Sequence, residues 1–288
     1  MNIKLLALKL NKIKQMYENA IITGQFIDSK GNLKTSTSGS KAKTSLTRSG
    51  KLIQNLHQVV KLSIKKDLRK NSLINSNFSI HPPLGKEKPE KETFGHLKSK
   101  KQDILVLFDS PNNEIISQGA LKGQMDKVGF DNTQKAIIIG VRSQLSSIDK
   151  NFDTLMERAY AEALNTRLRT PKTIMGEVFL IPVNEYEEKT MKNKIVSFSP
   201  NKTKIEKYLS IFKEISNRKN FTKKLDYYKY ERTCVLIVDF QQNPIKIYET
   251  KQELIQDGLI SSDCKIDYSK LSPKNFSKDI VTIYNSRH

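Results

Sequence analysis

The chain has 288 residues, of which 50 are Lys or Arg and 30 are Asp or Glu, so its formal net charge at pH 7 is +20. This length is enough for one large domain or two small ones with a hydrophobic core, and the positive charge favours a polyanionic partner such as nucleic acid. The two cysteines and four scattered histidines exclude a disulfide framework and a zinc site with four nitrogen or sulfur ligands, whereas a carboxylate site for a hard cation stays open.

The N-terminal segment 1–24 predicts a helix, because apolar side chains from Leu6 to Tyr17 recur near helical spacing. Its other face is basic, and Lys4 and Lys9 interrupt any signal-peptide core. A basic amphipathic helix can lie on a membrane surface, but packing against its own domain is the commoner arrangement. Because no run of about 18 apolar residues occurs, we expect no transmembrane span and a cytoplasmic protein.

Residues 28–50 are rich in Ser, Thr, Gly and Lys, which predicts a flexible loop. The segment superficially resembles a phosphate-binding loop. However, Lys51 is followed by leucine, and Ser45 stands where the first glycine is required, so a nucleoside triphosphate site is excluded. Two alternatives stay open for this segment: a mobile basic loop that closes over DNA, and a plain disordered loop.

The remaining chain alternates between apolar strands and helices. After a second helix at 51–70 and an extended, proline-containing segment at 81–102, we expect strands at 103–108, 136–142, 174–183 and 234–240, helices from about 150 to 169 and at 201–218, and a short strand and helix within 244–258. This alternation predicts an α/β fold with a mixed, largely parallel central sheet flanked by helices on both faces. We expect a single domain over 1–288, in which a helical and flexible basic region at 1–80 packs on a core at 81–288.

Charged residues at strand ends suggest a reactive site. Asp103 opens an apolar strand, where a carboxylate requires a partner or a metal. The strand that ends at Arg142 is followed by a helix that carries Glu157 and Glu162. These acids can assemble a pocket for Mg²⁺, which would activate water and neutralise charge on a phosphodiester. In the alternative interpretation, Asp103 is a turn or cap residue and the glutamates pair with Arg158 or with lysines on the helix surface.

The triplet Arg142-Ser143-Gln144 follows the second apolar strand without a break. Arg presents a fork to the edge of guanine, and Gln presents a donor and an acceptor to adenine. The alternative for Arg142 is a buried pair with a carboxylate that fixes the next helix. The residues that we expect to contact DNA are Lys100, Lys101, Arg142, Ser143, Gln144, Ser146, Ser147 and Lys150.

Four segments together resemble bacterial type II restriction endonucleases and, more broadly, the PD-(D/E)xK nuclease superfamily: "QDILV" (102–106), "VRSQLSSIDKNFDTLMERAYAEALN" (141–165), "MGEVFLIPV" (175–183) and "YERTCVLIVDF" (230–240). The resemblance extends over about 80–288. It implies a restriction-endonuclease-like fold and Mg²⁺-dependent cleavage of double-stranded DNA at a palindromic site by a homodimer, with a DNA methyltransferase as the partner of the system. A non-catalytic DNA-binding protein of the same fold and a non-specific, repair-type nuclease stay open as alternatives.

The pattern of this superfamily is an aspartate that opens one strand, followed by an acid, any residue and a lysine on the next strand. Asp103 fits the first position, whereas residues 140–142 read Gly-Val-Arg where the acid and the lysine would stand. Some related enzymes supply the second carboxylate from the following helix. The resemblance therefore implies Asp103 and Glu157 as metal ligands, with Glu162 as the alternative and Glu177 next in order. The arginine of the triplet either replaces the lysine or reads guanine.

Overall fold

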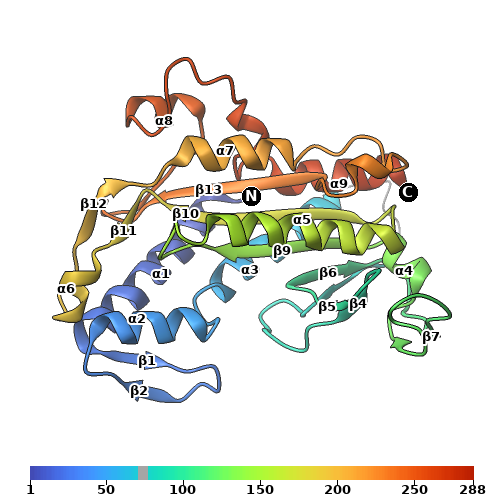
Figure 1. Ribbon diagram of the computed structural model, residues 1–288, viewed down its shortest axis with the longest axis horizontal. Coiled ribbons are helices and arrows are strands. Elements are labelled where there is room, and N and C mark those ends of the chain that lie inside the picture. Colours follow the sequence, from blue (N-terminus) through green and yellow to red (C-terminus); the bar gives the residue numbers. More distant parts are fainter. Residues whose placement is uncertain (71–76) are drawn as a thin grey trace.

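A six-stranded mixed sheet forms the centre of the molecule in a computed structural model that describes residues 1–70 and 77–288 (Figure 1). The strand order is β14-β13-β10-β9-β6-β3. The bounds are β3 (Ser79–His81), β6 (Ile104–Leu107), β9 (Ile137–Ser143), β10 (Ile174–Pro182), β13 (Arg232–Asp239) and β14 (Lys246–Ile247). The mixed sheet is confirmed, but the expectation of a largely parallel one is wrong. Only β9, β10 and β13 are mutually parallel, and the other three pairings are antiparallel.

Strands β10 and β13 are buried along their entire lengths, which agrees with their largely apolar sequences. In the parallel pairing of β10 with β9, Glu177 lies beside Gly140 and Phe179 beside Arg142. Side chains alternate between the two faces of a strand. Glu177 and Arg142 therefore point to the same face of the sheet.

Helices cover both faces of this sheet (Figure 1). One hydrophobic cluster joins Ile139 and Val178 to α1 (Ile3–Thr23), α3 (Gln54–Lys70) and α9 (Phe276–Arg287). A second cluster joins Ile138 and Phe179 to α5 (Phe152–Arg169) and α7 (Ile205–Glu214). Glu177 and Arg142 share the face that α5 covers, so the helix after β9 lies over them.

The segment 28–50 is more ordered than its composition predicts. It contains β2 (Leu33–Thr35), which pairs with β1 (Gln25–Ile27), and the helix α2 (Gly39–Arg48). The expected flexible loop is therefore wrong. Ala42 and Leu46 are buried in the same cluster as α1 and the sheet, and this packing outweighs the weak helix preference of the surrounding Ser and Thr residues.

The other elements are short and lie around the edges of the sheet. They are β4 (Glu92–Phe94), β5 (Ser99–Lys101), β7 (Glu114–Ile115), β8 (Met125–Asp126), α4 (Phe130–Gln134), β11 (Asn184–Tyr186), α6 (Glu188–Lys192), β12 (Phe198–Lys202), η1 (Lys224–Asp226), α8 (Lys251–Gln256) and η2 (Tyr268–Lys270). The helix expected at 201–218 is shorter than predicted, because β12 occupies its first residues and α7 ends at Glu214. Among the described residues, no helix is both long and apolar enough to cross a membrane.

Candidate functional site

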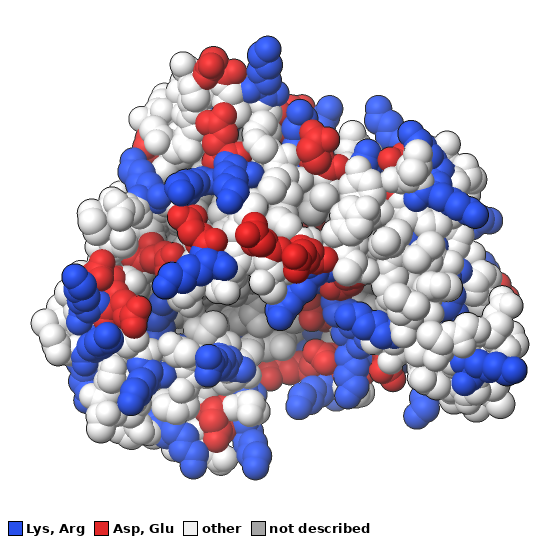
Figure 2. Space-filling view, in the orientation of Figure 1, with Lys and Arg blue, Asp and Glu red and all other residues white. Residues whose placement is uncertain are grey.

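A pocket of about 780 Å³ opens where β9 ends and β6 begins. Figure 2 shows the corresponding hollow, which both basic and acidic side chains border. Its walls come from α5, the β4–β5 hairpin and the N-terminal region, which contributes Tyr17 of α1, Thr47 of α2 and Ile53 before α3. The pocket is lined by seven of the residues predicted to bind metal, catalyse cleavage or contact DNA: Lys100, Asp103, Arg142, Ser143, Gln144, Glu157 and Glu162.

Asp103 precedes β6 and is partly buried. Its Oδ2 accepts a hydrogen bond of 2.9 Å from the backbone N–H of Val141. The antiparallel register, which places Ile104 opposite Ile139, brings the start of β6 to this part of β9. The Asp103 carboxylate is therefore held at the junction of Gly140 and Val141.

Glu177 reaches the same junction from the other neighbouring strand. Its side chain is almost fully buried, and a Cβ atom placed on Gly140 would lie only 2.1 Å from Oε2 of Glu177. The carboxylate thus fills the space that any side chain at position 140 would need. Glu177 was only the third candidate for the second acid, after two glutamates of α5, because the pairing of β10 with β9 is not visible in the sequence.

The Glu177 carboxylate is incompletely satisfied. Nε of Arg142 lies 2.9 Å from its Oε1, but neither carboxylate oxygen has an aligned hydrogen bond among the described residues. Burial raises the pKa of Glu177, against the opposing charges of Arg142 and Lys100. A buried carboxylate without hydrogen bonds is unfavourable in free energy, so its retention calls for an explanation such as a bound cation.

Glu162 is the glutamate of α5 that turns toward the sheet. Its carboxylate forms ion pairs with both Arg142 and Lys100. Glu157 is exposed at the rim of the pocket, and no cation pairs with it in the part of the chain that the structure describes. The geometry therefore favours Glu162 over Glu157 as the α5 residue that acts at the strand end.

The polar residues after β9 do not all face the pocket. Ser143 and Gln144 line it, but Nε2 of Gln144 donates a hydrogen bond of 2.5 Å to the carbonyl oxygen of Ser146. Ser147 donates its backbone N–H to Glu185 over 2.7 Å. Gln144 thus stabilises its own loop, and an adenine would have to replace this internal hydrogen bond.

The predicted basic residues are also divided between two surfaces. Lys100 and Lys101 are consecutive on β5, so their side chains point to opposite faces. Lys100 enters the pocket, whereas Lys101 is exposed and lines a separate surface depression with Glu90. Lys150 is exposed outside the pocket lining. Only Lys100 of these three is placed beside the acids.

A divalent cation would find two carboxylates here, those of Asp103 and Glu177. Within the described ranges, no group of three or more His, Cys, Asp or Glu side chains is arranged to hold a metal. Mg²⁺ is commonly bound by one or two carboxylates and keeps several waters, so two acids suffice for it. The unsatisfied oxygens of Glu177 and the absence of a side chain at Gly140 fit such an ion.

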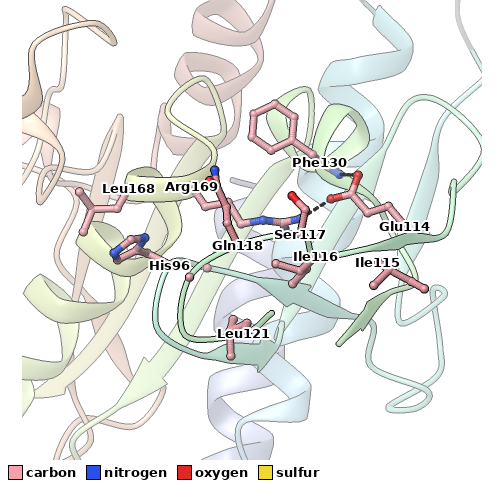
Figure 3. Close-up of a pocket in the computed structure, with 12 residues that line it drawn as sticks. His96, Glu114, Ile115, Ile116, Ser117, Gln118, Leu121, Phe130, Leu168 and Arg169 are labelled. Carbon is pink, nitrogen blue, oxygen red and sulfur yellow. Dashed lines mark hydrogen bonds and ion pairs between the residues drawn. The ribbon is translucent and has the colours of Figure 1, made fainter. Parts of the chain in front are cut away.

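A second pocket of about 640 Å³ adjoins the first, and Gly95 lines both. Its charged groups are already paired, since Arg169 contacts both Glu114 and Asp126. Figure 3 shows Arg169 and Glu114 beside the apolar side chains of this pocket. It therefore lacks a counterpart of the first site, where the partly buried Lys100 and Arg142 lie beside Glu162 and Arg142 also contacts the unsatisfied Glu177.

No family model, curated protein or solved structure matches this chain.

Proposed function

We propose that this protein is a Mg²⁺-dependent endonuclease that cleaves double-stranded DNA at a specific sequence, with a fold of the restriction-endonuclease, PD-(D/E)xK type. One observation carries the proposal: the carboxylates of Asp103 and Glu177 both lie at Gly140, and Arg142 follows on the same strand. The arrangement is that of two acids and a cation, although the second acid belongs to a different strand from the one that the superfamily pattern specifies.

The residues that line the pocket, and the buried Glu177 behind Arg142, have complementary roles in this proposal. Asp103 and Glu177 would hold Mg²⁺, which supplies charge neutralisation and an activated water when bound. Arg142 and Lys100 would stabilise negative charge on the scissile phosphate from fixed positions. The surplus of basic residues would attract the DNA backbone, with an affinity that decreases steeply as salt increases.

The proposed active form is a homodimer on a palindromic site. Each protomer has one such pocket, and two-fold symmetry of the protein would place one pocket at each DNA strand. A methyltransferase that modifies the same sequence would be the expected partner, since the host must protect its own sites. The cytoplasm is the compartment in which both would act.

The direct test is incubation of purified protein with phage DNA in Mg²⁺ or in a chelator, followed by sequencing of the ends. We expect discrete fragments only with Mg²⁺. Asp103→Asn and Glu177→Gln should each abolish cleavage and retain DNA binding, whereas Glu157→Gln serves as a control at the rim. Cleavage in the presence of chelator, or undiminished cleavage by both acid variants, would contradict the proposal.

The alternative of a non-catalytic DNA-binding protein is favoured by one observation, the ion pair of Arg142 with Glu177, which supplies one of the two acids with a positive partner that is not a metal. Such a protein would bind DNA and leave it intact with Mg²⁺ or Mn²⁺. A non-specific nuclease would instead produce a smear of fragments with no common sequence at the ends.

A further inference from the structure

The carboxylate of Glu162 lies between two cations, one on the β4–β5 hairpin and one on the central sheet. Lys100 belongs to β5 and Arg142 to β9, and both form ion pairs with this one carboxylate. The three side chains are only 14–29% exposed, so water competes weakly for their charges. A single anionic group thus bridges two partly buried cations at the wall of an open pocket.

We infer that Lys100 and Arg142 form a binding site for a phosphate group, and that Glu162 occupies this site in the free protein until a phosphate displaces it. The identification of that phosphate as part of a DNA backbone rests on the function proposed above. The anion site itself follows from the contacts of Glu162, whatever the larger ligand is.

The charge balance of the pocket permits this exchange. Glu162 contacts both Lys100 and Arg142, and Glu177 contacts Arg142, so a phosphodiester that takes the place of the Glu162 carboxylate leaves the charge in contact with the two cations unchanged. Lys100 is a partly buried cation whose pKa burial lowers, with Asp103 acting in the opposite direction. Such a cation needs an anionic partner in either state, and a phosphate oxygen meets that need as well as a carboxylate does.

Two features indicate that Glu162 is the group that moves. Arg142 contacts Glu162 through Nη2 and Glu177 through Nε, so it keeps one carboxylate when the other leaves. Glu177 is enclosed by the sheet, whereas Glu162 lines an open pocket into which its side chain can rotate. The Glu162 carboxylate is therefore hydrated when it leaves, and Arg142 keeps Glu177 as an anionic partner.

The probe is inorganic phosphate, measured by titration calorimetry at low ionic strength with the wild type, Glu162→Gln and Glu157→Gln. Removal of the competing carboxylate should lower the Kd for phosphate by about tenfold, equivalent to about 1.4 kcal/mol. Glu157→Gln lies on the same helix and lines the same pocket but forms no ion pair with the described residues, so its Kd should equal that of the wild type. Adding Lys100→Gln to Glu162→Gln should remove the gain.

An equal decrease of the Kd in both single variants would show a general charge effect and overturn the inference, as would weaker or unchanged binding by Glu162→Gln. Glu162→Ala provides a second test without a side-chain amide that could still bind Arg142, and thermal denaturation verifies folding of each variant. If Glu162→Gln and Glu162→Ala both fail to fold, Glu162→Asp should give a smaller decrease of the Kd for phosphate. An unchanged Kd would again overturn the inference.

Cleavage of phage DNA, measured on the same preparations, separates the two proposals. Tighter phosphate binding by Glu162→Gln without cleavage by any preparation would support the anion site and count against the nuclease. Cleavage by the wild type, with no gain in phosphate binding from Glu162→Gln, would overturn the anion site alone. Loss of cleavage in Glu162→Gln without that gain would assign Glu162 to the metal and likewise overturn the inference.

Discussion

Two buried glutamates on neighbouring strands differ in how completely the protein satisfies them. Glu231, immediately before β13, receives the backbone N–H of Met175 over 2.7 Å and ion pairs from three arginines, Arg167, Arg218 and Arg287. Glu177 of β10 has one arginine in contact and no aligned hydrogen bond among the described residues. Both side chains are essentially inaccessible to solvent.

The difference appears in their proton affinities. Burial alone would raise the pKa of Glu231, but the three arginines together lower it. Burial prevails at Glu177 and raises its pKa, because Arg142 and Lys100 compensate only in part. Because both carboxyl groups are buried, the difference between their pKa values comes from their partners, chiefly the three arginines at Glu231. Glu231 joins α5, α9 and β13 as a structural anchor, whereas Glu177 keeps capacity for a further positive ligand.

The comparison is tested most strongly by the loss of each carboxylate charge. Glu231→Gln should destabilise the protein by about 3–5 kcal/mol, because three buried arginines lose their anion. Glu177→Gln should change the free energy of unfolding by less than about 1 kcal/mol, since it removes a charge that was poorly compensated. Urea denaturation of both variants measures the difference, and equal losses would show that the two glutamates are equivalent anchors.

The comparison of buried charges also includes a positive one, the side chain of Lys43. Lys43 of α2 lies near the rings of Tyr17 and Tyr186, and its Nζ donates to the carbonyl oxygen of Leu145 over 3.3 Å. Burial lowers its pKa from 10.5 to about 8. The unfolded chain therefore binds this proton more tightly than the folded protein does. The free energy of unfolding should rise with pH between about 8 and 10.5, and below about pH 8 it should be reduced by the full cost of burying the charged lysine.

We therefore expect Lys43→Met to stabilise the protein at pH 7 by up to about 3 kcal/mol, at 1.36 kcal/mol for each pKa unit. The gain should decrease at pH 10, where the wild-type lysine is largely neutral in the folded state. Thermal denaturation at both pH values measures it. A gain that is the same at both would show that packing, and not charge, is responsible.

Replacement of Arg142 by lysine tests the role of the cation that contacts both Glu162 and Glu177. Lysine is a point charge and cannot bridge Glu162 and Glu177 with separate nitrogens. We expect Arg142→Lys to slow cleavage roughly thirtyfold at every sequence alike, equivalent to about 2 kcal/mol. Cleavage of the cognate site and of each single-base variant provides the measurement. A loss of about 1–3 kcal/mol in discrimination at one base position would instead assign Arg142 to the reading of guanine.

The raised pKa of Glu177 has a smaller, continuous consequence. The carboxyl must lose its proton to bind a cation, so cleavage should increase with pH, by about tenfold per unit, until it passes the pKa of the folded state. More Mg²⁺ should move the midpoint of this curve to lower pH, because the cation competes with the proton. A profile that does not respond to Mg²⁺ would place the titrating group elsewhere.

The sequence predicted the central elements well where their signal is continuous. The apolar runs at 136–142 and 174–183 correspond closely to β9 and β10, and α5 ends at the predicted Arg169. The helices α2 and α9 were missed. In α2 the apolar positions Ala42 and Leu46 are few, and their burial depends on α1, which composition cannot show.

The site was predictable only in part. Asp103 and Arg142 attract notice because charges at the ends of apolar strands need partners. Glu177 stands alone within an apolar run, and its importance follows only from the pairing of β10 with β9. Glu162 and Glu157 were not distinguishable by spacing alone, since the choice between them depends on how α5 rotates against the sheet.

Glycine at position 140 leaves room for the carboxylate of Glu177, so the second acid of the site can come from β10 and not from β9. Because Gly140 and Glu177 are paired in the parallel register, a glutamate at 140 with a glycine at 177 would carry its carboxylate on the same face of the sheet, one strand away. The double exchange Gly140→Glu with Glu177→Gly therefore moves a carboxyl group by 37 positions along the chain and keeps it on the face of the sheet that carries Arg142. Two proteins can in this way have the same arrangement of charges, although no short motif is common to their sequences.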